Sequence, residues 1–384
     1  MSDTATTKTP LYLEHIEAGA KMVNFHGFEL PISYSSITDE HLATRKSAGI
    51  FDVSHMGLFK FHGKNIRDWL SSVSTQDITK FEVGRCGYTH FLDHDGFIID
   101  DMIFAVKSEN EILGVPNASM IEIMKNWFYS QIPIDSDISI QDLSNETSII
   151  SLQGPESPKI ISSLLGKDNC VNPFRCKQIS SNSNNIEGWI QGTGYTGERG
   201  FEIFINNADA PNLWNLILHN PEIKTTPVGL GARDTLRLEM GYLLSGQDFI
   251  WPKLNSQSES MIPSNYLYRN ISETAVPFGL DLNHNFIGKE STVKLLESKT
   301  KLIGLKCLEK GPSPRKGHAV YINDSENIIP LGYVTSGAPS PSLDNTGIAL
   351  AYVENFSDLT NVWIQSSKKR RVKCKIVNPP FIQN

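Results

Sequence analysis

Apolar and polar positions alternate along the chain with two different periods, which together predict a mixture of helices and strands. Helical spacing marks Thr38–Ala48, Asn65–Val73, Ser119–Ser130, Pro158–Leu165 and Ala232–Leu244. Strand patterns mark Leu58–His62, Phe97–Val106, Ile112–Val115 and Ser148–Leu152. The turn Asp93-His94-Asp95-Gly96 lies between two apolar runs and predicts a hairpin. Strands mixed with helices and joined by hairpins favour an α+β fold over a doubly wound parallel sheet.

Three stretches modify this pattern. The first helix carries its own boundary signals, with Thr38 as N-cap and Gly49 just past its end. Phe249–Ser272 has little periodicity and is rich in Ser, Asn and Pro, so we expect a long surface insertion. From Lys301 onward short β-like runs alternate with turn residues, which predicts a separate small β-domain.

Two adjacent carboxylates interrupt the apolar run around Ile98–Phe104. Neighbouring residues of a strand point to opposite faces, so Asp100 and Asp101 do not form a paired acid/base site. One of them must still lie against apolar surroundings, where a carboxylate is costly unless it is hydrogen-bonded. Two interpretations remain: a structural aspartate bound by backbone amides, or a carboxylate reserved for a polar ligand group.

The segment Gly192–Gly197 matches the dinucleotide-binding pattern G-x-G-x-x-G. That mechanism requires a helix to begin at the glycines, but the following Glu198–Ile205 is strand-like. We therefore reject a nucleotide site and expect the glycines to shape a hairpin that presents Tyr195 and Glu202. An ordinary turn tyrosine and an ordinary strand glutamate fit the local sequence equally well.

Charged residues also gather on the predicted helix that begins at Ala232. Arg233 and Arg237 are four residues apart and share a face, with Asp234 and Glu239 as possible partners. A solvated ionic face is the favoured interpretation, and the alternative is Arg233 reaching an anionic ligand. His55 follows Asp52 and Ser54, but neighbours in a short segment do not converge as a catalytic triad. A hydrogen-bonded packing histidine is favoured there.

Composition narrows the class of protein. The 384 residues carry 35 Lys and Arg against 42 Asp and Glu, a net charge of −7 that argues against nucleic acid or anionic lipid as partner. No apolar stretch is long enough for a membrane span. The five cysteines include no C-x-x-C pair, so neither a disulfide framework nor a metal site is expected. Met1–Pro10 lacks the features of a signal or transit peptide, which predicts a cytoplasmic protein.

Several short motifs, taken in order, resemble one family. They include Thr9–Tyr12, Gly19–Val23, Phe51–Gly57, Asp100-Asp101, Leu152–Pro155, Gly194–Glu198, Gly229–Glu239, Phe286–Glu290, Val334–Gly337 and Pro339–Leu343. This series is similar to the glycine cleavage T-protein family of folate-dependent aminomethyltransferases. The resemblance extends from Thr9 to Phe381.

The resemblance implies an architecture and a reaction. The family fold is a three-domain cloverleaf, with two interleaved α+β folate-binding domains and a C-terminal β-barrel. We therefore expect a catalytic region over 1–300, with subdomains of roughly 1–55 plus 145–250 and 56–144, and a barrel over 301–384. The implied reaction takes the aminomethyl group from the lipoylated H-protein, releases ammonia and converts tetrahydrofolate to 5,10-methylenetetrahydrofolate.

Site residues follow from the same resemblance. Asp100 is implied as the key acid at the pterin, where an ionised carboxylate can orient folate and stabilise positive charge on the one-carbon unit. Glu202 is implied to hydrogen-bond the pterin amino edge. The remaining implied pocket residues are Met56, Asn117, Tyr195, Arg233 and Arg315, the two arginines facing the folate tail or the donor arm.

Two departures from the family pattern keep other functions open. His284 stands where the family has a tryptophan, seven residues after Pro277, and Trp251 in the longer 249–272 segment is a candidate replacement. These departures change the expected wall of the folate channel. The protein could therefore instead be a folate-dependent demethylase of a small methylated amine or sulfonium compound. A non-catalytic folate-binding scaffold is the third alternative, although its K-G-C-x-G-Q-E motif is absent. The basic run Lys368–Arg371 is a candidate surface for steering the H-protein.

Overall fold

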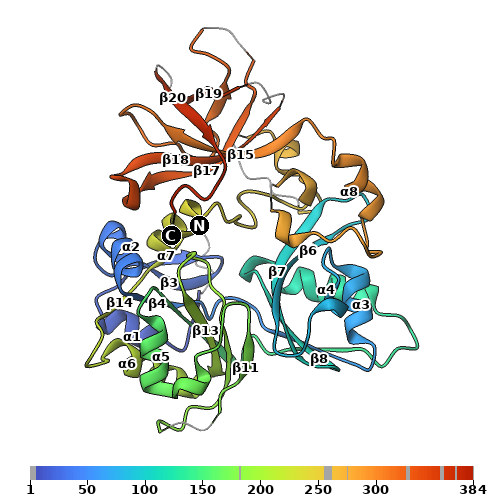
Figure 1. Cartoon of the computed structure of the whole chain (residues 1–384), viewed down its shortest axis with the longest axis vertical. Coiled ribbons are helices and arrows are strands. Elements are labelled where there is room, and N and C mark those ends of the chain that lie inside the picture. The colour runs from blue at the N-terminus through green and yellow to red at the C-terminus, as the bar shows by residue number, and fades with distance from the viewer. Residues whose placement is uncertain are drawn as a thin grey trace. The chain divides into compact units, whose positions relative to one another are not determined.

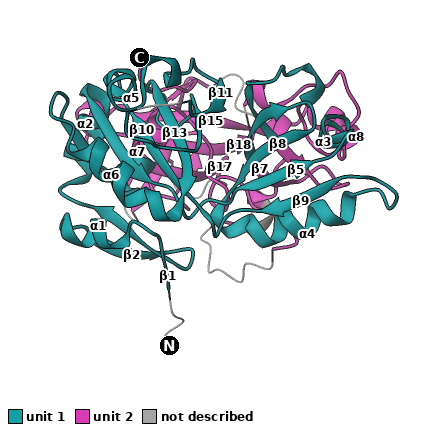
Figure 2. Cartoon of the chain, turned by 90° about the horizontal axis from the view of Figure 1, so that it is seen from below, with its two compact units in different colours: residues 1–71, 77–89, 102–234 teal, residues 72–76, 90–101, 235–384 magenta. Residues whose placement is uncertain are grey.

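The computed structural model describes residues 6–180, 183–254, 262–274, 276–325, 329–354, 359–367 and 370–383. The chain divides into two compact units (Figure 2). Unit 1 comprises residues 1–71, 77–89 and 102–234, and unit 2 comprises residues 72–76, 90–101 and 235–384. Helices and strands are mixed throughout, so the predicted α+β class is confirmed (Figure 1). No helix in the described ranges is long and apolar enough to cross a membrane.

Unit 1 is built mainly on three sheets. The first has the order β1-β3-β2, with bounds Thr7–Lys8, Phe28–Ser33 and Lys21–Phe25. The second has the order β11-β12-β13-β10-β4-β14, with bounds Cys176–Gln178, Trp189–Gln191, Gly200–Asn206, Thr147–Gln153, Ala48–Asp52 and Thr225–Pro227. The third has the order β6-β7-β8-β5-β9, with bounds Cys86–Leu92, Ile98–Ser108, Glu111–Pro116, Phe59–His62 and Ser139–Asp142.

Helices outside the barrel connect these strands or flank them. Their bounds are α1 Tyr12–Glu17, α2 Ile37–Lys46, α3 Ile66–Val73, α4 Ile121–Gln131, α5 Ser157–Leu165, α6 Ala210–Leu218, α7 Leu230–Glu239 and α8 Lys289–Leu295. The chain passes from one unit to the other within α3, β6, β7 and α7, and also after Gln76, between α3 and the following 3-10 helix Ile78–Lys80. The predicted turn Asp93–Gly96 lies between β6 and β7. The backbone N–H of Asp93 donates a hydrogen bond of 3.0 Å to the carbonyl of Phe97 across this turn.

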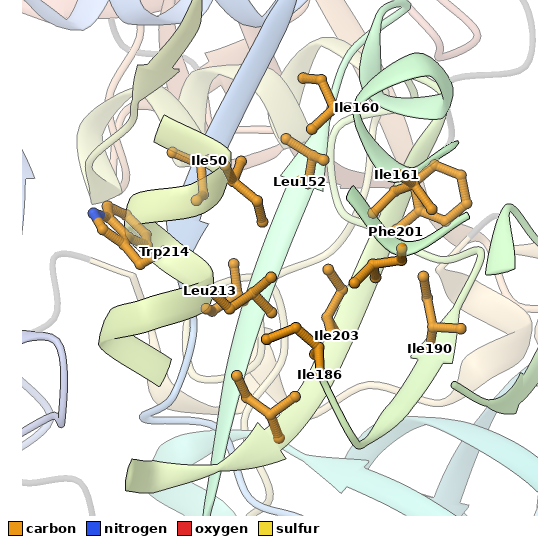
Figure 3. Packing of buried hydrophobic residues seen from close by; sticks show 14 of the residues in the cluster. Ile50, Leu152, Ile160, Ile161, Ile186, Ile190, Phe201, Ile203, Leu213 and Trp214 are labelled. Atoms are coloured by element: carbon orange, nitrogen blue, oxygen red, sulfur yellow. The ribbon is translucent and has the colours of Figure 1, made fainter. Parts of the chain in front are cut away.

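One hydrophobic core of unit 1 lies where α5 and α6 cover the six-stranded sheet (Figure 3). Both helices carry apolar residues at helical spacing, so each turns one continuous stripe toward the sheet. The packed side chains include Ile50, Leu152, Ile190, Phe201 and Ile203 from the strands and Ile160, Ile161, Leu213 and Trp214 from the helices. Burying a side chain of this size contributes about 1.5–3 kcal/mol relative to leaving it in water.

The predicted N-cap of the first long helix is wrong by two residues. Helix α2 begins after Ser36, whose Oγ accepts a hydrogen bond of 3.1 Å from the backbone N–H of Asp39. A serine hydroxyl satisfies this orphan donor as well as the predicted threonine would. The helix also ends before Ala48 because Ala48–Asp52 form the wholly buried strand β4.

Two further expectations are corrected in unit 2. Helix α7 ends at Glu239, before the predicted Leu244, because Gly241 adopts a positive φ of 73° that ends the helix. The 249–272 segment is not a surface insertion over its described part. Phe249, Leu267 and Ile271 are buried, and short 3-10 helices, Ser264–Leu267 and Ile271–Glu273, replace regular periodicity. Residues 255–261 of this segment lie outside the described residues.

The C-terminal part of unit 2 forms a closed six-stranded barrel (Figure 1). Its strand order is β15-β18-β17-β16-β19-β20, with bounds Thr300–Cys307, Thr346–Glu354, Gly332–Ser340, Ala319–Tyr321, Asn361–Ser367 and Arg370–Val377. Alternate residues along the strands, among them Ile303, Leu305 and Cys307, join one interior cluster. The predicted β character of this region is confirmed, whereas the division of the chain at residue 300 stays a prediction.

Candidate active site

The loop between β12 and β13 carries the glycine-rich motif. The two strands pair antiparallel, with Gln191 opposite Glu202, so the predicted hairpin is confirmed and no helix follows the glycines. Buried Gln153 holds the loop: its Nε2 donates to the Thr193 carbonyl over 3.1 Å, and its Oε1 accepts from Thr196 Oγ1 over 3.1 Å. A Cβ on Gly194 would collide with the Gln153 side chain, so this close approach requires glycine.

Glu202 lies on β13 beside this loop and is half-buried. Thr193 Oγ1 donates a hydrogen bond of 2.6 Å to Glu202 Oε2. Burial raises the pKa of the carboxyl, and the bond from Thr193 and the charge of Arg233 oppose that rise only in part. Within the described residues no hydrogen bond reaches Glu202 Oε1, so this oxygen can accept N–H donors from a ligand.

Arg233 completes this group from the first turn of α7. Its guanidinium lies over the Tyr195 ring, 4.9 Å from the centroid. Burial lowers the pKa of Arg233, and the neighbouring Glu202 and Tyr195 oppose that shift. The helix start is fixed because the Gly229 N–H donates to buried Glu40 Oε2 over 2.9 Å. Tyr195, Glu202 and Arg233 are therefore brought together in unit 1.

Met56 and Asn117 lie at a second contact in unit 1. The Gly57 N–H donates to the Pro116 carbonyl over 3.1 Å, which places the residues before and after that bond on adjoining turns. Both side chains are half-buried. The charge of Arg233 helps to lower the pKa of His55, the residue before Met56.

The predicted packing role of His55 is confirmed, but the predicted hydrogen bond is not. Its ring packs edge-on against Phe25 with centroids 5.6 Å apart, and Nδ1 has no hydrogen-bond partner among the described residues. Asp52 points elsewhere: its Oδ2 accepts from Thr9 over 2.7 Å and contacts His15 Nε2 at 2.9 Å. Burial raises the pKa of Asp52, but the bond and charge of His15 together with the hydrogen bonds from Ser54 and Thr9 outweigh it and lower the pKa, so the carboxyl stays ionised. No Ser-His-Asp triad forms here.

Neutral His55 predicts a loss of stability in acid. Burial, assisted by Arg233, lowers its pKa to about 3, whereas the unfolded chain titrates near 6.5. The unfolded state then binds more protons below pH 6.5, so the free energy of unfolding falls as pH is lowered from 6.5. Between pH 6.5 and 5 this residue contributes a loss of about 2 kcal/mol. Denaturant titrations at several pH values measure the free energy of unfolding. We expect it to fall less steeply with decreasing pH in His55→Gln than in wild type, while exposed His62→Gln keeps the wild-type pH dependence.

Asp100 is the buried member of the adjacent carboxylates, as the strand pattern predicts. It lies in unit 2 with no exposed surface, between the buried residues Ile99 and Met102, whereas Asp101 is half-buried. Ser245 Oγ donates a hydrogen bond of 2.8 Å to Asp100 Oδ1. The expected hydrogen bonding of the buried carboxylate is thus satisfied in part by a side-chain hydroxyl.

The other candidates in unit 2 differ from one another. Arg315 is exposed and donates from one guanidinium nitrogen to the Gly337 carbonyl over 3.0 Å. Arg237 does not lie on a solvated face: it is fully buried and pairs with Asp248 at 2.9 Å. His284 Nε2 lies 3.0 Å from the Ser74 carbonyl, and Trp251 Nε1 donates to Asp93 Oδ2 over 2.8 Å. Whether Trp251 replaces the family tryptophan stays a prediction.

Sequence reasoning missed two hydroxyls that bind the candidate carboxylates. Thr193 lies inside the glycine motif, whose spacing indicates roles only for the glycines. Ser245 is far from Asp100 in sequence, so no local pattern links the two residues. The only available signals were their places in motif-like segments, Gly192–Gly197 and Ser245–Asp248. Within the described residues no group of three or more His, Cys, Asp and Glu side chains is arranged to hold a metal ion.

Comparison with known proteins places the chain in a family. The GCVT N-terminal domain profile matches residues 11–252, and the glycine cleavage T-protein C-terminal barrel domain matches residues 300–383. An aminomethyltransferase of Geobacillus sp. (strain WCH70) is 35% identical over 380 residues, covering 97% of this chain and 98% of its own. The aminomethyltransferase of Bacillus pumilus (strain SAFR-032) is 36% identical over 383 residues, covering 97% and 98%.

A solved structure agrees with these sequence matches. The glycine cleavage system aminomethyltransferase T from Bartonella henselae superposes with a TM-score of 0.84, at 26% identity, and covers 98% of each chain. Both family domains, the nearly full-length relatives and this fold point the same way. The chain belongs to the family of glycine cleavage system T-proteins, the aminomethyltransferases.

Proposed function

We propose that this protein takes the aminomethyl group from the lipoyl arm of an H-protein and passes its one-carbon unit to tetrahydrofolate. Ammonia leaves, and 5,10-methylenetetrahydrofolate forms. The observation that carries the proposal is the 35% identity to curated aminomethyltransferases over 97% of the chain. Asp100, fully buried in its strand, supports it, because a carboxylate stands there where an apolar residue would pack at lower cost.

The residues of unit 1 fit a folate. The half-buried Glu202 carboxylate can accept two N–H donors from the amino edge of the pterin, and Thr193 fixes its orientation. The Tyr195 ring, oriented by Arg233, offers an apolar face, with Met56 and Asn117 as further wall residues. Arg233 supplies charge for the folate tail or the donor arm. Arg315 lies in unit 2, and its predicted role toward the same groups stays a prediction. Tetrahydrofolate itself supplies the nitrogen nucleophiles that accept the one-carbon unit.

Asp100 would contribute to catalysis by stabilising positive charge on the transferred one-carbon unit. Transfer of the carbon away from nitrogen and sulfur develops positive charge, and a buried carboxylate stabilises such charge without reorganising solvent. The low dielectric around a fully buried group strengthens this interaction relative to water. Ser245 holds the carboxylate in one orientation, so it is a positioning residue for Asp100.

The decisive experiment is an assay with aminomethylated H-protein and tetrahydrofolate. We expect ammonia and 5,10-methylenetetrahydrofolate in equal amounts, and neither product when the H-protein lacks its lipoyl arm. Methylated folate formed from a small methylated amine or sulfonium without H-protein would establish the demethylase instead. Folate binding with no turnover of either donor would support the third alternative, a non-catalytic folate-binding scaffold.

Substituting Glu202 tests the folate pocket. Glu202→Gln is expected to raise KM for tetrahydrofolate about 10–100-fold, since a charge-assisted hydrogen bond is worth about 1.5–3 kcal/mol. Because burial raises the pKa of Glu202, wild-type affinity should fall as pH drops through that raised value and the carboxyl becomes neutral. The glutamine variant should lack this acid limb in a fluorescence titration. Exposed Glu187→Gln should match wild type at every pH, and an unchanged KM in Glu202→Gln would remove Glu202 from the pocket.

Two finer points stay predictions. We expect the protein in the cytoplasm, and we expect Lys368–Arg371 to steer the H-protein. Lys368 and Lys369 lie outside the described residues. Of the described residues beside them, Ser367 and Arg370 pair with each other at the end of β19 and β20.

A further inference from the structure

Two cysteines of the barrel face each other across neighbouring strands. Cys307 ends β15, and Cys374 is its register partner on β20. Their Sγ atoms lie 3.5 Å apart, and both residues are free thiols. Cys374 is fully buried and Cys307 is 9% exposed. The sequence alone does not predict this thiol pair, because the two cysteines are far apart along the chain.

The register shows why these thiols approach so closely. The Leu308 N–H donates to the Lys373 carbonyl over 2.9 Å, so Leu308 and Lys373 are a hydrogen-bonded pair. Antiparallel pairs alternate in type, which makes Cys307 and Cys374 a non-hydrogen-bonded pair with Cα atoms about 4.5 Å apart. That separation lies within the range that a disulfide spans. Closing the bond therefore requires the sulfurs to move about 1.5 Å, with no rearrangement of the strands.

The surroundings hold the Cys307 sulfur beside its partner. On the other flank, β18 presents Gly347, and a Cβ there would lie 2.9 Å from Cys307 Sγ. The glycine thus leaves room for the thiol between two strands. The hydrogen bond from Cys374 lowers the pKa of the Cys307 thiol and outweighs its burial, so Cys307 is the better nucleophile of the two.

We propose that Cys307 and Cys374 form a reversible disulfide in response to hydrogen peroxide. The Cys307 thiolate attacks one peroxide oxygen, the O–O bond breaks, and the departing oxygen leaves as water with the former Cys307 proton. The resulting sulfenic acid is attacked by Cys374 Sγ, the S–S bond forms, and the sulfenic oxygen leaves as a second water with the Cys374 proton. Two thiols are oxidised and one peroxide is reduced. This modification does not depend on the aminomethyltransferase activity.

Peptide mapping of the full-length protein tests this directly. Reduced protein is treated with hydrogen peroxide, quenched, unfolded in N-ethylmaleimide and digested without reductant. We expect a linked peptide pair containing Cys307 and Cys374, lighter by two hydrogens and separated again by dithiothreitol. The oxidised protein should also show a higher Tm, because the bond closes a long loop of the unfolded chain.

Variants separate the pair from general thiol oxidation. Cys374→Ser should give no linked peptide and no Tm rise, while dimedone should trap the Cys307 sulfenic acid. Cys170→Ser, which alters a half-buried thiol outside the pair, should behave as wild type. The proposal is overturned if both Cys307 and Cys374 remain fully alkylated after peroxide, or if each is oxidised separately to a sulfinic acid. The wild-type map decides the matter even if Cys374→Ser does not fold.

Discussion

Asp100→Asn lowers kcat for aminomethyl transfer by about 10²–10³-fold, the loss expected when one preorganised charged group is removed from a dry site. The change preserves volume, and the asparagine carbonyl can still accept the hydrogen bond that Ser245 donates to Asp100. What disappears is the negative charge in a fully buried position. Single-turnover measurement with aminomethylated H-protein reports this loss directly, while KM for tetrahydrofolate should change much less.

Asp101→Asn is the matched control, since it makes the same chemical change one residue along the same strand. Asp101 points to the opposite face of β7 and is half-buried, so its variant should keep kcat within a few-fold of wild type. Equal Tm values for both variants would show that folding is not the cause. Full activity of Asp100→Asn would remove Asp100 from the catalytic machinery, and a loss through KM alone would make it a folate-binding residue.

Substitution of Ser245 tests the role of the Asp100 carboxylate independently. If the hydroxyl only orients Asp100, Ser245→Ala should lower kcat by less than Asp100→Asn, and Ser245→Thr should restore most of it. A purely structural serine would instead change Tm with kcat unaltered.

Local patterning predicts the elements of this protein where apolar residues recur at helical spacing or form a short apolar run. Helix α5 and the strands β7 and β10 carry their periodicity openly, and their predicted bounds agree with the structure within a residue or two. The 249–272 segment cannot be predicted in this way, because its buried residues Phe249 and Ile271 lie in an isolated bridge and a short 3-10 helix rather than in a longer periodic element. Without periodicity, burial there depends on partners distant in sequence.

The candidate site shows the same limit. The buried character of Asp100 follows from two carboxylates in an apolar strand, which is a local pattern. The grouping of Tyr195, Glu202 and Arg233 comes from three separate segments, so only a family resemblance could anticipate it. The roles of Thr193 and Ser245 depend on side-chain geometry that no spacing encodes.

Arg237 is the plainest failure of local reasoning, and it leads to the largest expected effect on stability. Its spacing from Arg233 suggests a solvated face, but residues distant in sequence cover it. One of its guanidinium nitrogens donates to Asp248 Oδ2 over 2.9 Å, and another donates to Ser336 Oγ over 2.8 Å. Asp248 Oδ1 also accepts from Thr335 Oγ1 over 2.5 Å. Every ion in this network is fully buried.

Asp248→Ala should therefore lower the free energy of unfolding by about 3–5 kcal/mol, because it leaves the Arg237 charge buried without its counter-ion. Denaturant titration measures the loss, and Asp248→Asn, which retains acceptors for the hydroxyls, should lose less. The solvent-accessible pair of half-buried Glu156 and exposed Lys159 is the control: Glu156→Ala should cost less than about 1 kcal/mol.

The double variant Arg237→Met/Asp248→Leu distinguishes a buried pair from simple loss of packing. Removing both charges eliminates the uncompensated ion, so the double variant should be more stable than Asp248→Ala although it changes one residue more. A loss equal to the sum of the two single variants would show that the ions do not interact. A loss below about 1 kcal/mol for Asp248→Ala would mean that water reaches Arg237 and neutralises the cost of its charge.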